Sequence, residues 1–410
     1  MNRPERPLRW PREPSTVLAV ALVAVLAADG GLLLSAGSHA PMSVSVQTWA
    51  VGPGLTANIS VANGPVPISA QVSLVPGHSN PSRDGTVLYF EDNQFPSLYS
   101  PFSSTFSIGV RVDQYLGLMG SSLRVEGVTS ADVVGALVDH PAGTLVIVGT
   151  GVIPETLYSA SQNRLPLWVA GGGTLVWAGG PLGYSEGHVT ATGFKYASLG
   201  WAGQTRFFGF PLSDPVNLTS TDPADYPPVY GTVPTPLGSA LGIVYSGTAS
   251  GANVTQVALH GGTTLGVRTP DGGPGSASPR TALAYVPLGA GAVWYFGGAL
   301  FAPLIGTIPQ GSVNLSEDIA LVLGVGYRPA AGAADLRTVD LGPLARTTVS
   351  LSVADRSVGV VTIVRGQTEG ALLYFFAESL ALPRAVARPM PSTGRIDRWI
   401  APRGDAATGR

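Results

Sequence analysis

The sequence predicts an α/β protein: a parallel sheet covered by helices, flanked by two β-sandwich-like segments and preceded by one N-terminal transmembrane helix. Three observations predict this class. Apolar strand-like runs alternate with helix-like periodicity between residues 86 and 185. Short runs of strand-like residues, partly alternating apolar with polar, occupy residues 42–76 and 335–382. A long apolar segment follows an arginine-rich start.

Composition excludes several classes of function. The 410 residues include no cysteine, which excludes disulfides, thiol catalysis, iron–sulfur clusters and cysteine-ligated zinc. Charged residues make up 12% of the chain and the net charge is −2, with arginines gathered near both ends and an acidic excess between them. A nucleic-acid partner needs a basic stripe, so we expect none.

The N-terminus has the pattern of an export signal. A basic stretch, residues 1–14, precedes an apolar segment at residues 15–37 that is long enough as a helix to cross a bilayer. The excess of arginine at the start predicts an N-terminus in the cytosol and the bulk of the chain outside it. Asp29 interrupts the apolar segment, so two alternatives stay open: an uncleaved signal anchor with membrane attachment, or a cleaved signal peptide and a secreted protein.

Residues 42–76 form the first β segment. Gly52-Pro53-Gly54 and Asn63-Gly64-Pro65 are turn signals between short strand-like runs. The polar stretch Pro76–Gly85 then predicts a boundary before the next unit.

The next unit, residues 86–328, is expected to be the α/β domain. Its strands are apolar throughout, which is typical of a parallel sheet covered on both faces. The expected strands are Thr86–Phe90, Ser122–Val125, Thr144–Val148 and Thr174–Ala178. The expected helices are Ser104–Gly120, Ala131–Asp139 with Ser130 as a cap, and Pro154–Ala170 with a break or kink at Pro166.

The second half of this unit is less regular. Residues 186–280 are expected to be a loop-rich insertion with few strands. Ala282–Pro287 and Ala292–Gly297 then predict a hairpin of buried strands, and Glu317–Gly324 predicts a helix. A second β segment follows at residues 335–382, and the proline- and arginine-rich tail, residues 384–410, is expected to be disordered.

The order of these elements resembles the class I glutamine amidotransferase-like superfamily, whose fold is flavodoxin-like α/β. The run Gly171-Gly172-Gly173-Thr174-Leu175-Val176-Trp177 before the turn Gly179-Gly180-Pro181, and the late segment Val286–Gly297, carry the resemblance. Catalytic members use a cysteine at a sharp turn after a strand. Here that turn reads Ala178-Gly179-Gly180-Pro181, so the resemblance implies a degenerate domain without amidotransferase activity.

A divalent metal is the one cofactor that the sequence suggests. Glu91 and Asp92 follow the first strand of the α/β unit, where ligands of open α/β sheets bind. Carboxylate oxygens are ligands for Mg²⁺ or Ca²⁺, and His188, which follows a later strand, could complete a mixed site. The alternative is that these acids cap a turn or a helix.

Aromatic residues gather in the loop-rich insertion. They could line a sugar- or peptide-binding surface or pack beneath the loops. The set is Trp201, Phe207, Phe208, Phe210, Tyr226 and Tyr230.

Because no nucleophile–base pair is recognisable, the leading expectation is a membrane-anchored extracytoplasmic protein whose domain binds a partner, an envelope protein or glycan, or supports envelope assembly. One alternative is a metal-assisted hydrolase of envelope glycans or peptides that uses Glu91, Asp92 and His188. Another is an accessory subunit of an export or transport machine, which Asp29 within the apolar segment suggests.

Overall fold

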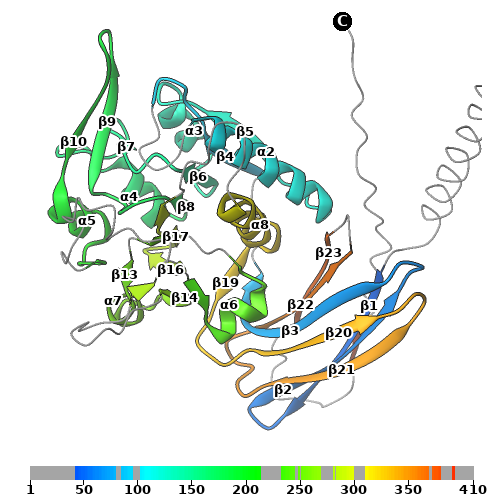
Figure 1. Cartoon of the computed structure of the whole chain (residues 1–410). Coiled ribbons are helices and arrows are strands. Elements are labelled where there is room, and N and C mark those ends of the chain that lie inside the picture. The colour runs from blue at the N-terminus through cyan, green and yellow to red at the C-terminus, as the bar shows by residue number, and fades with distance from the viewer. Residues whose placement is uncertain are drawn as a thin grey trace, which may run out of the picture.

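The computed structural model describes residues 42–79, 85–95, 102–213, 232–244, 248–249, 251–268, 280–281, 283–299, 310–368, 372–379 and 390–392. This part of the chain is mostly β, with 47% of it in strands and 23% in helices. It divides into a β sandwich and a unit built on one large mixed sheet (Figure 1).

The sandwich consists of two antiparallel sheets. The first has the order β21-β2-β1-β24 and contains Arg346–Val353, Gly54–Asn63, Met42–Val51 and Met390–Ser392. The second has the order β19-β3-β22-β23, with β20 also paired to β3, and contains Tyr327–Pro329, Ile68–Ser79, Val360–Gln367, Leu372–Ser379 and Asp335–Leu341. Residues 42–76 and 335–382 therefore pair with each other, through β2 with β21 and through β3 with β20 and β22.

Alternation along the strands builds the core of the sandwich. Ala57, Ile59 and Val61 of β2 are fully buried while the residues between them are partly exposed. They pack in one apolar cluster with residues of the second sheet, including Val72 and Leu74 of β3. One face of each sheet is thus covered by the other.

The large sheet has eight strands in the order β11-β14-β16-β17-β8-β6-β4-β5. Strands β5, β4, β6, β8 and β17 run parallel, whereas β17, β16, β14 and β11 pair antiparallel. In sheet order the strands are Thr232–Pro234, Thr263–Arg268, Leu283–Leu288, Gly291–Phe296, Thr174–Ala178, Thr144–Val148, Thr86–Phe90 and Arg124–Val128.

Helices cover both faces of this sheet. Residues of α2, α6 and α8 share one core with Val87, Val146 and Val176, whereas α3, α4, α5 and α7 share a second core with their strand neighbours Leu88, Leu145 and Leu175. The helices are Phe102–Leu118, Val133–Asp139, Arg164–Ala170, Gly200–Phe208, Pro236–Leu241, Val254–Leu259 and Gln310–Val325, labelled α2 to α8. Adjacent strand residues enter opposite cores, which explains why these strands are apolar throughout.

Short strands complete the unit. β7, β9 and β10 form a three-stranded sheet, in which β9 and β10 are a hairpin that projects from the body of the molecule (Figure 1). Two further pairs are β12 with β18 and β13 with β15. These strands are Ile153–Pro154, Ser185–Thr190, Gly193–Ser198, Thr248–Ala249, Gly298–Ala299, Ala252–Asn253 and Arg280–Thr281.

A polar contact joins the sandwich to the large-sheet unit. Arg365 of β22 forms an ion pair with Glu317 of α8, and the Tyr374 hydroxyl of β23 bonds to both side chains at 3.3 Å. The Gln71 amide of β3 donates to the Ser239 carbonyl of α6 at 2.6 Å. Val361 and Ile363 of β22 also belong to the same apolar core as α8, so the two units share buried surface.

The predicted fold class is wrong for this chain. The structure is mostly β rather than α/β, with several sheets, antiparallel ones among them. Within the described part of residues 186–280, the expected loop-rich insertion contains the strands β9, β10, β11 and β14. Helices are short where glycine and proline are frequent, and α4 begins at Arg164, later than expected. Pro166 therefore lies in the first turn of α4, where a backbone N–H has no intrahelical acceptor, so the N–H that proline lacks removes no helical hydrogen bond.

The predicted end segments lie largely outside the described residues. Within the described part no helix is long and apolar enough to cross a membrane, and the predicted transmembrane segment 15–37 is not part of it. Of the tail expected to be disordered, residues 390–392 form β24 and the remainder is not described.

Candidate functional site

Asp92 is a structural carboxylate at the end of β4. It is 8% exposed, and one oxygen accepts hydrogen bonds from the Ser130 backbone N–H and hydroxyl, at 2.9 and 2.5 Å. The other oxygen accepts from the Gln94 N–H at 2.8 Å. The two bonds from Ser130 fasten the loop after β4 to the loop after β5, and the bond from Gln94 stabilises a turn within the first of these loops. Ser130, expected to cap α3, bonds to Asp92 instead, and the N-cap position of α3 is Asp132.

Glu91 lies beside Asp92 in a different environment. Its backbone N–H donates to the Val128 carbonyl at 2.8 Å, which continues the ladder between β4 and β5. Its side chain is partly buried next to Gly127, and this burial raises the pKa of the carboxyl group. The pKa of the buried Tyr89 phenol is also raised, by its burial and secondarily by the charge of Glu91. An ionised Glu91 is therefore disfavoured by its surroundings.

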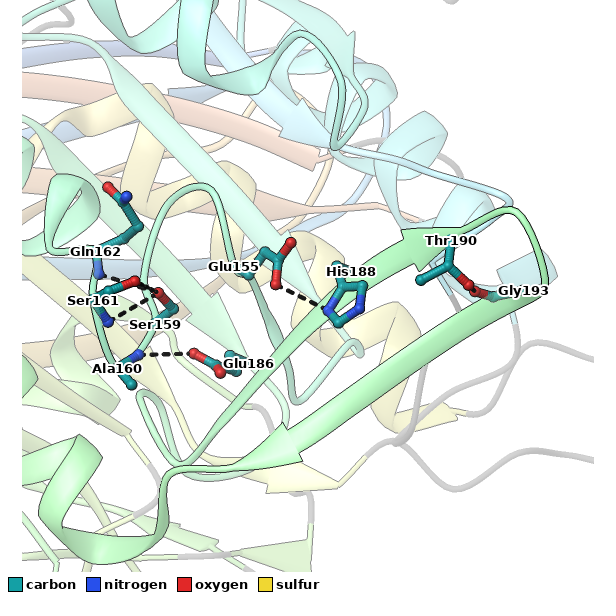
Figure 2. A network of polar contacts seen from close by, with 9 residues as sticks. All are labelled: Glu155, Ser159, Ala160, Ser161, Gln162, Glu186, His188, Thr190 and Gly193. Atoms are coloured by element: carbon teal, nitrogen blue, oxygen red, sulfur yellow. Dashed lines mark hydrogen bonds and ion pairs between the residues drawn. The ribbon is translucent and has the colours of Figure 1, made fainter.

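His188 lies on β9 and is paired with a residue that the sequence analysis did not select. Its Nδ1 is 2.9 Å from Oε2 of Glu155, and both side chains are partly exposed, 38% and 45% (Figure 2). Two residues earlier, Glu186 accepts a hydrogen bond from the Ala160 N–H at 2.9 Å. The hairpin is thus fastened on this face to the loop between β7 and α4.

The opposite face of the hairpin contacts the loop that contains Asp92. The rings of Phe95 and Phe194 meet edge to face with centroids 4.7 Å apart, and Gly187 lies directly against both. Because side chains alternate along a strand, Gly187 facing Phe95 places its neighbour His188 on the other face, toward Glu155. β9 therefore lies close to the loop that contains Glu91 and Asp92, but the His188 imidazole is on the face of β9 that points away from those two carboxylates.

The predicted metal set is consequently not assembled. Among the described residues no three histidine, cysteine, aspartate or glutamate side chains lie close enough together to hold a metal ion. Asp92 is occupied by Ser130 and Gln94, and His188 by Glu155. The alternative interpretation from the sequence, in which the acids stabilise turns, describes Asp92.

The turn after β8 holds no nucleophile. Gly179 and Gly180 have φ values of 108° and 74°, a conformation that favours glycine. The Gly180 carbonyl accepts hydrogen bonds from the Trp177 indole at 2.9 Å and the Tyr295 hydroxyl at 3.3 Å. The turn is therefore packed into the core by its neighbours.

The aromatic set of the insertion is mainly core. Phe207, Phe208 and Phe210 are at most 8% exposed, Trp201 packs edge to face on Tyr184, and Tyr226 and Tyr230 lie outside the described residues. Within the described part of the insertion, Tyr196 of β10 is an exposed aromatic side chain: it is 60% exposed and its ring stacks on Phe194. The alternating run Phe194-Lys195-Tyr196 after a Thr-Gly turn signal was the sequence feature that could have located it.

Comparisons with known proteins returned no relative: no family model, no curated protein and no solved structure matches this chain.

Proposed function

We propose that this chain is an extracytoplasmic protein that binds an envelope protein through the β9–β10 hairpin, without catalysis of its own. The observation that supports this best is the projecting hairpin with its exposed Tyr196 (Figure 1). In the described part of the chain β10 is the outer strand of its sheet, so its outer backbone groups have no neighbouring strand there. Edge strands of this kind accept an added strand from a partner, and exposed aromatic rings supply contact area.

A photo-crosslinking amino acid at Tyr196 tests the proposal in the host cell. We expect a discrete adduct with one protein when Tyr196 is replaced, and none when the probe replaces Leu167 of α4. Leu167 is a suitable control because it is 65% exposed and lies on the helix α4, outside the sheet that contains β10. Equal labelling from both positions, or no adduct from position 196, would contradict the proposal.

Metal-assisted hydrolysis by Glu91, Asp92 and His188 is the alternative, and a thermal-shift titration separates the two. A ligand that binds only the native state raises its stability by mass action. If the chain binds a partner without catalysis, Mg²⁺, Ca²⁺ or Zn²⁺ should not raise its melting temperature through Asp92 and His188. Any shift caused by these metals should therefore persist in the D92N and H188Q variants. A saturable shift that both variants remove would favour the hydrolase.

Location at the membrane is proposed from the basic stretch 1–14 and the apolar segment 15–37. Protease added to intact spheroplasts is expected to degrade the body of the chain, while the protein stays in the membrane fraction. Release into the medium would favour the cleaved signal peptide, and protection from protease would contradict export.

A further inference from the structure

One end of the β sandwich carries two neighbouring apolar turns. The first, Gly64-Pro65-Val66-Pro67, joins β2 to β3, and the second, Gly342-Pro343-Leu344-Ala345, joins β20 to β21 (Figure 1). Val66 is 52% exposed and Leu344 is 73% exposed, and the prolines of both turns are exposed as well. Exposed turns are ordinarily rich in polar residues, whereas neither of these contains a charged or polar side chain.

Hydrogen bonds fasten the two apolar turns to each other. The Leu344 N–H donates to the Gly64 carbonyl at 2.7 Å. The buried side-chain amide of Asn63 donates to the carbonyls of Val66 and Gly342, at 2.7 and 2.9 Å. The turns are therefore held together, and their exposed side chains form one apolar surface of fixed shape.

Leu344 is kept at this surface in an unfavourable backbone conformation. Within the described part of the chain it is the one non-glycine residue with a positive φ, 56°. Glycine or asparagine adopts this conformation at lower cost than leucine. Because a side chain that is 73% exposed adds little to the core, the leucine points to a contact outside the folded chain.

The apolar turns lie at the end of the sandwich where β1 begins. Met42, the first residue of β1, is the register partner of Asn63. The apolar segment 15–37 ends five residues before Met42, and a chain of that length spans at most about 18 Å. The turn after β21, at the opposite end of the sandwich, contains the charged residues Asp355 and Arg356. The end nearest to the apolar segment is thus the one with the apolar surface.

We propose that the two apolar turns insert into the surface of the lipid bilayer that holds residues 15–37, and this inference rests on the membrane location proposed above. Val66 and Leu344 lie at the boundary between headgroups and acyl chains, where apolar side chains leave water. Prolines have no N–H to desolvate there, and the Leu344 N–H is already bonded to Gly64. The sandwich then stands on the membrane by this end.

Depth-dependent fluorescence quenching tests this contact, since a chain without cysteine accepts a label at a single chosen position. V66C and L344C are made in the full-length chain, labelled with bimane, and reconstituted into vesicles of phosphatidylethanolamine and phosphatidylglycerol. A fraction of the lipid carries a nitroxide high on the acyl chain.

V51C is the matched control. Val51 is 56% exposed, close to the value for Val66, and lies at the opposite end of the sandwich in the β1–β2 hairpin. We expect the labels at positions 66 and 344 to be quenched about threefold more strongly than the label at position 51. Equal quenching at the three positions, or none, overturns the proposal.

Flotation of the same vesicles separates this inference from the membrane location. A chain that does not float with the lipid overturns both, whereas a chain that floats without quenching at position 66 overturns the inference alone. If position 66 is shielded in native membranes but not quenched in the protein-free vesicles, the turns contact a partner protein instead.

The L344N variant excludes misfolding as the cause of a weaker signal. Asparagine tolerates a positive φ, so L344N removes the apolar side chain without strain in the turn. We expect an unchanged melting temperature and about twofold weaker quenching of the label at position 66 in L344N. Unchanged quenching would show that Leu344 does not contact the lipid and would overturn the proposal.

Discussion

Asp92 illustrates how far single residues can be interpreted from sequence. Its place after an apolar strand was correctly predicted, because four consecutive apolar residues, 87–90, end at Phe90. Its chemistry was not predictable, because the partner that occupies it, Ser130, is 38 positions away in the chain. The partner of His188 was not predictable for another reason. Alternation along β9 decides which face of the strand His188 occupies, and the register of a hairpin whose residues are mostly polar cannot be predicted from the sequence.

The bonds of Asp92 predict a loss of stability when it is removed. D92A leaves the Ser130 and Gln94 N–H groups without their acceptor, and hydrogen bonds to a charged group are worth about 1.5–3 kcal/mol. We expect a comparable decrease in the free energy of unfolding, measured with urea. Asp139 is exposed at the end of α3, so D139N should change the value by less than about 0.5 kcal/mol. Equal effects of the two variants would contradict a structural role for Asp92.

Glu91 predicts a pH dependence of stability. Burial raises its folded-state pKa above the unfolded value, so the folded state binds the proton more tightly. Its contribution to stability is therefore most favourable below the unfolded pKa and is lost as the pH rises through the folded pKa. E91Q is expected to unfold at higher urea than the wild type at neutral pH, and the difference should shrink toward acidic pH. If the stability difference between E91Q and the wild type grows on acidification, folding does not raise the pKa of Glu91 and the prediction is contradicted.

At the scale of an element, the β9–β10 hairpin also shows how far structure can be predicted from the sequence. Most of it lies in residues 186–280, which were expected to be a loop-rich insertion with few strands. Gly187 explains why glycine is needed within a strand: an added Cβ would lie 2.6 Å from the Phe194 ring, which Phe95 already contacts. Strands with buried faces, such as β6 and β8, were found from sequence because every residue in them is apolar or threonine.

Gly187 gives a prediction for this element. G187A forces the Phe194 ring away from Phe95, and overpacking of this kind costs about 1–3 kcal/mol. We expect a lower unfolding midpoint and a shift of the Phe95 ring signals in an NMR spectrum. G135A is the control, because nothing lies within 4 Å of a Cβ built at Gly135 in α3 and alanine favours the helix. If G187A is as stable as the wild type, the hairpin does not pack on Phe95.

At the scale of the whole molecule, the sequence predicted where several strands lie along the chain but not which strands pair with one another. β4, β6 and β8 have the expected bounds, and β16 and β17 lie within one residue of theirs. The antiparallel strands β11 and β14 extend the sheet from a region expected to be loop-rich. Sheet pairing depends on contacts between distant residues, which periodicity does not report. The result is a mostly β molecule in which the sandwich and the large sheet share one apolar core.

The Arg365–Glu317 ion pair predicts that the two units unfold together. Both side chains are largely buried, 14% and 13% exposed, so removing one partner leaves a buried charge unpaired. Such changes cost about 3–5 kcal/mol, whereas replacing both partners by apolar residues is often close to neutral. R365M should therefore lower stability more than the R365M/E317M double variant.

Fluorinated tryptophan resolves the two units in that experiment. Trp49 reports on β1 of the sandwich and Trp177 on β8 of the large sheet. We expect both signals to shift to the unfolded position at the same temperature in the wild type and at a lower common temperature in R365M. Separate transitions in the wild type would contradict a shared core.

The pairing of β1 with β24 brings distant parts of the chain together. Val46 is the register partner of Ser392, and Met42 lies four residues, about 13 Å, further along the same strand. A circular permutant should therefore fold if a short glycine-rich linker joins Ser392 to Met42 and new termini open between Ala191 and Thr192, which are exposed at the hairpin tip. Such a permutant would lack the N-terminal segment, and its solubility would show directly whether the body of the protein needs a membrane to stay folded.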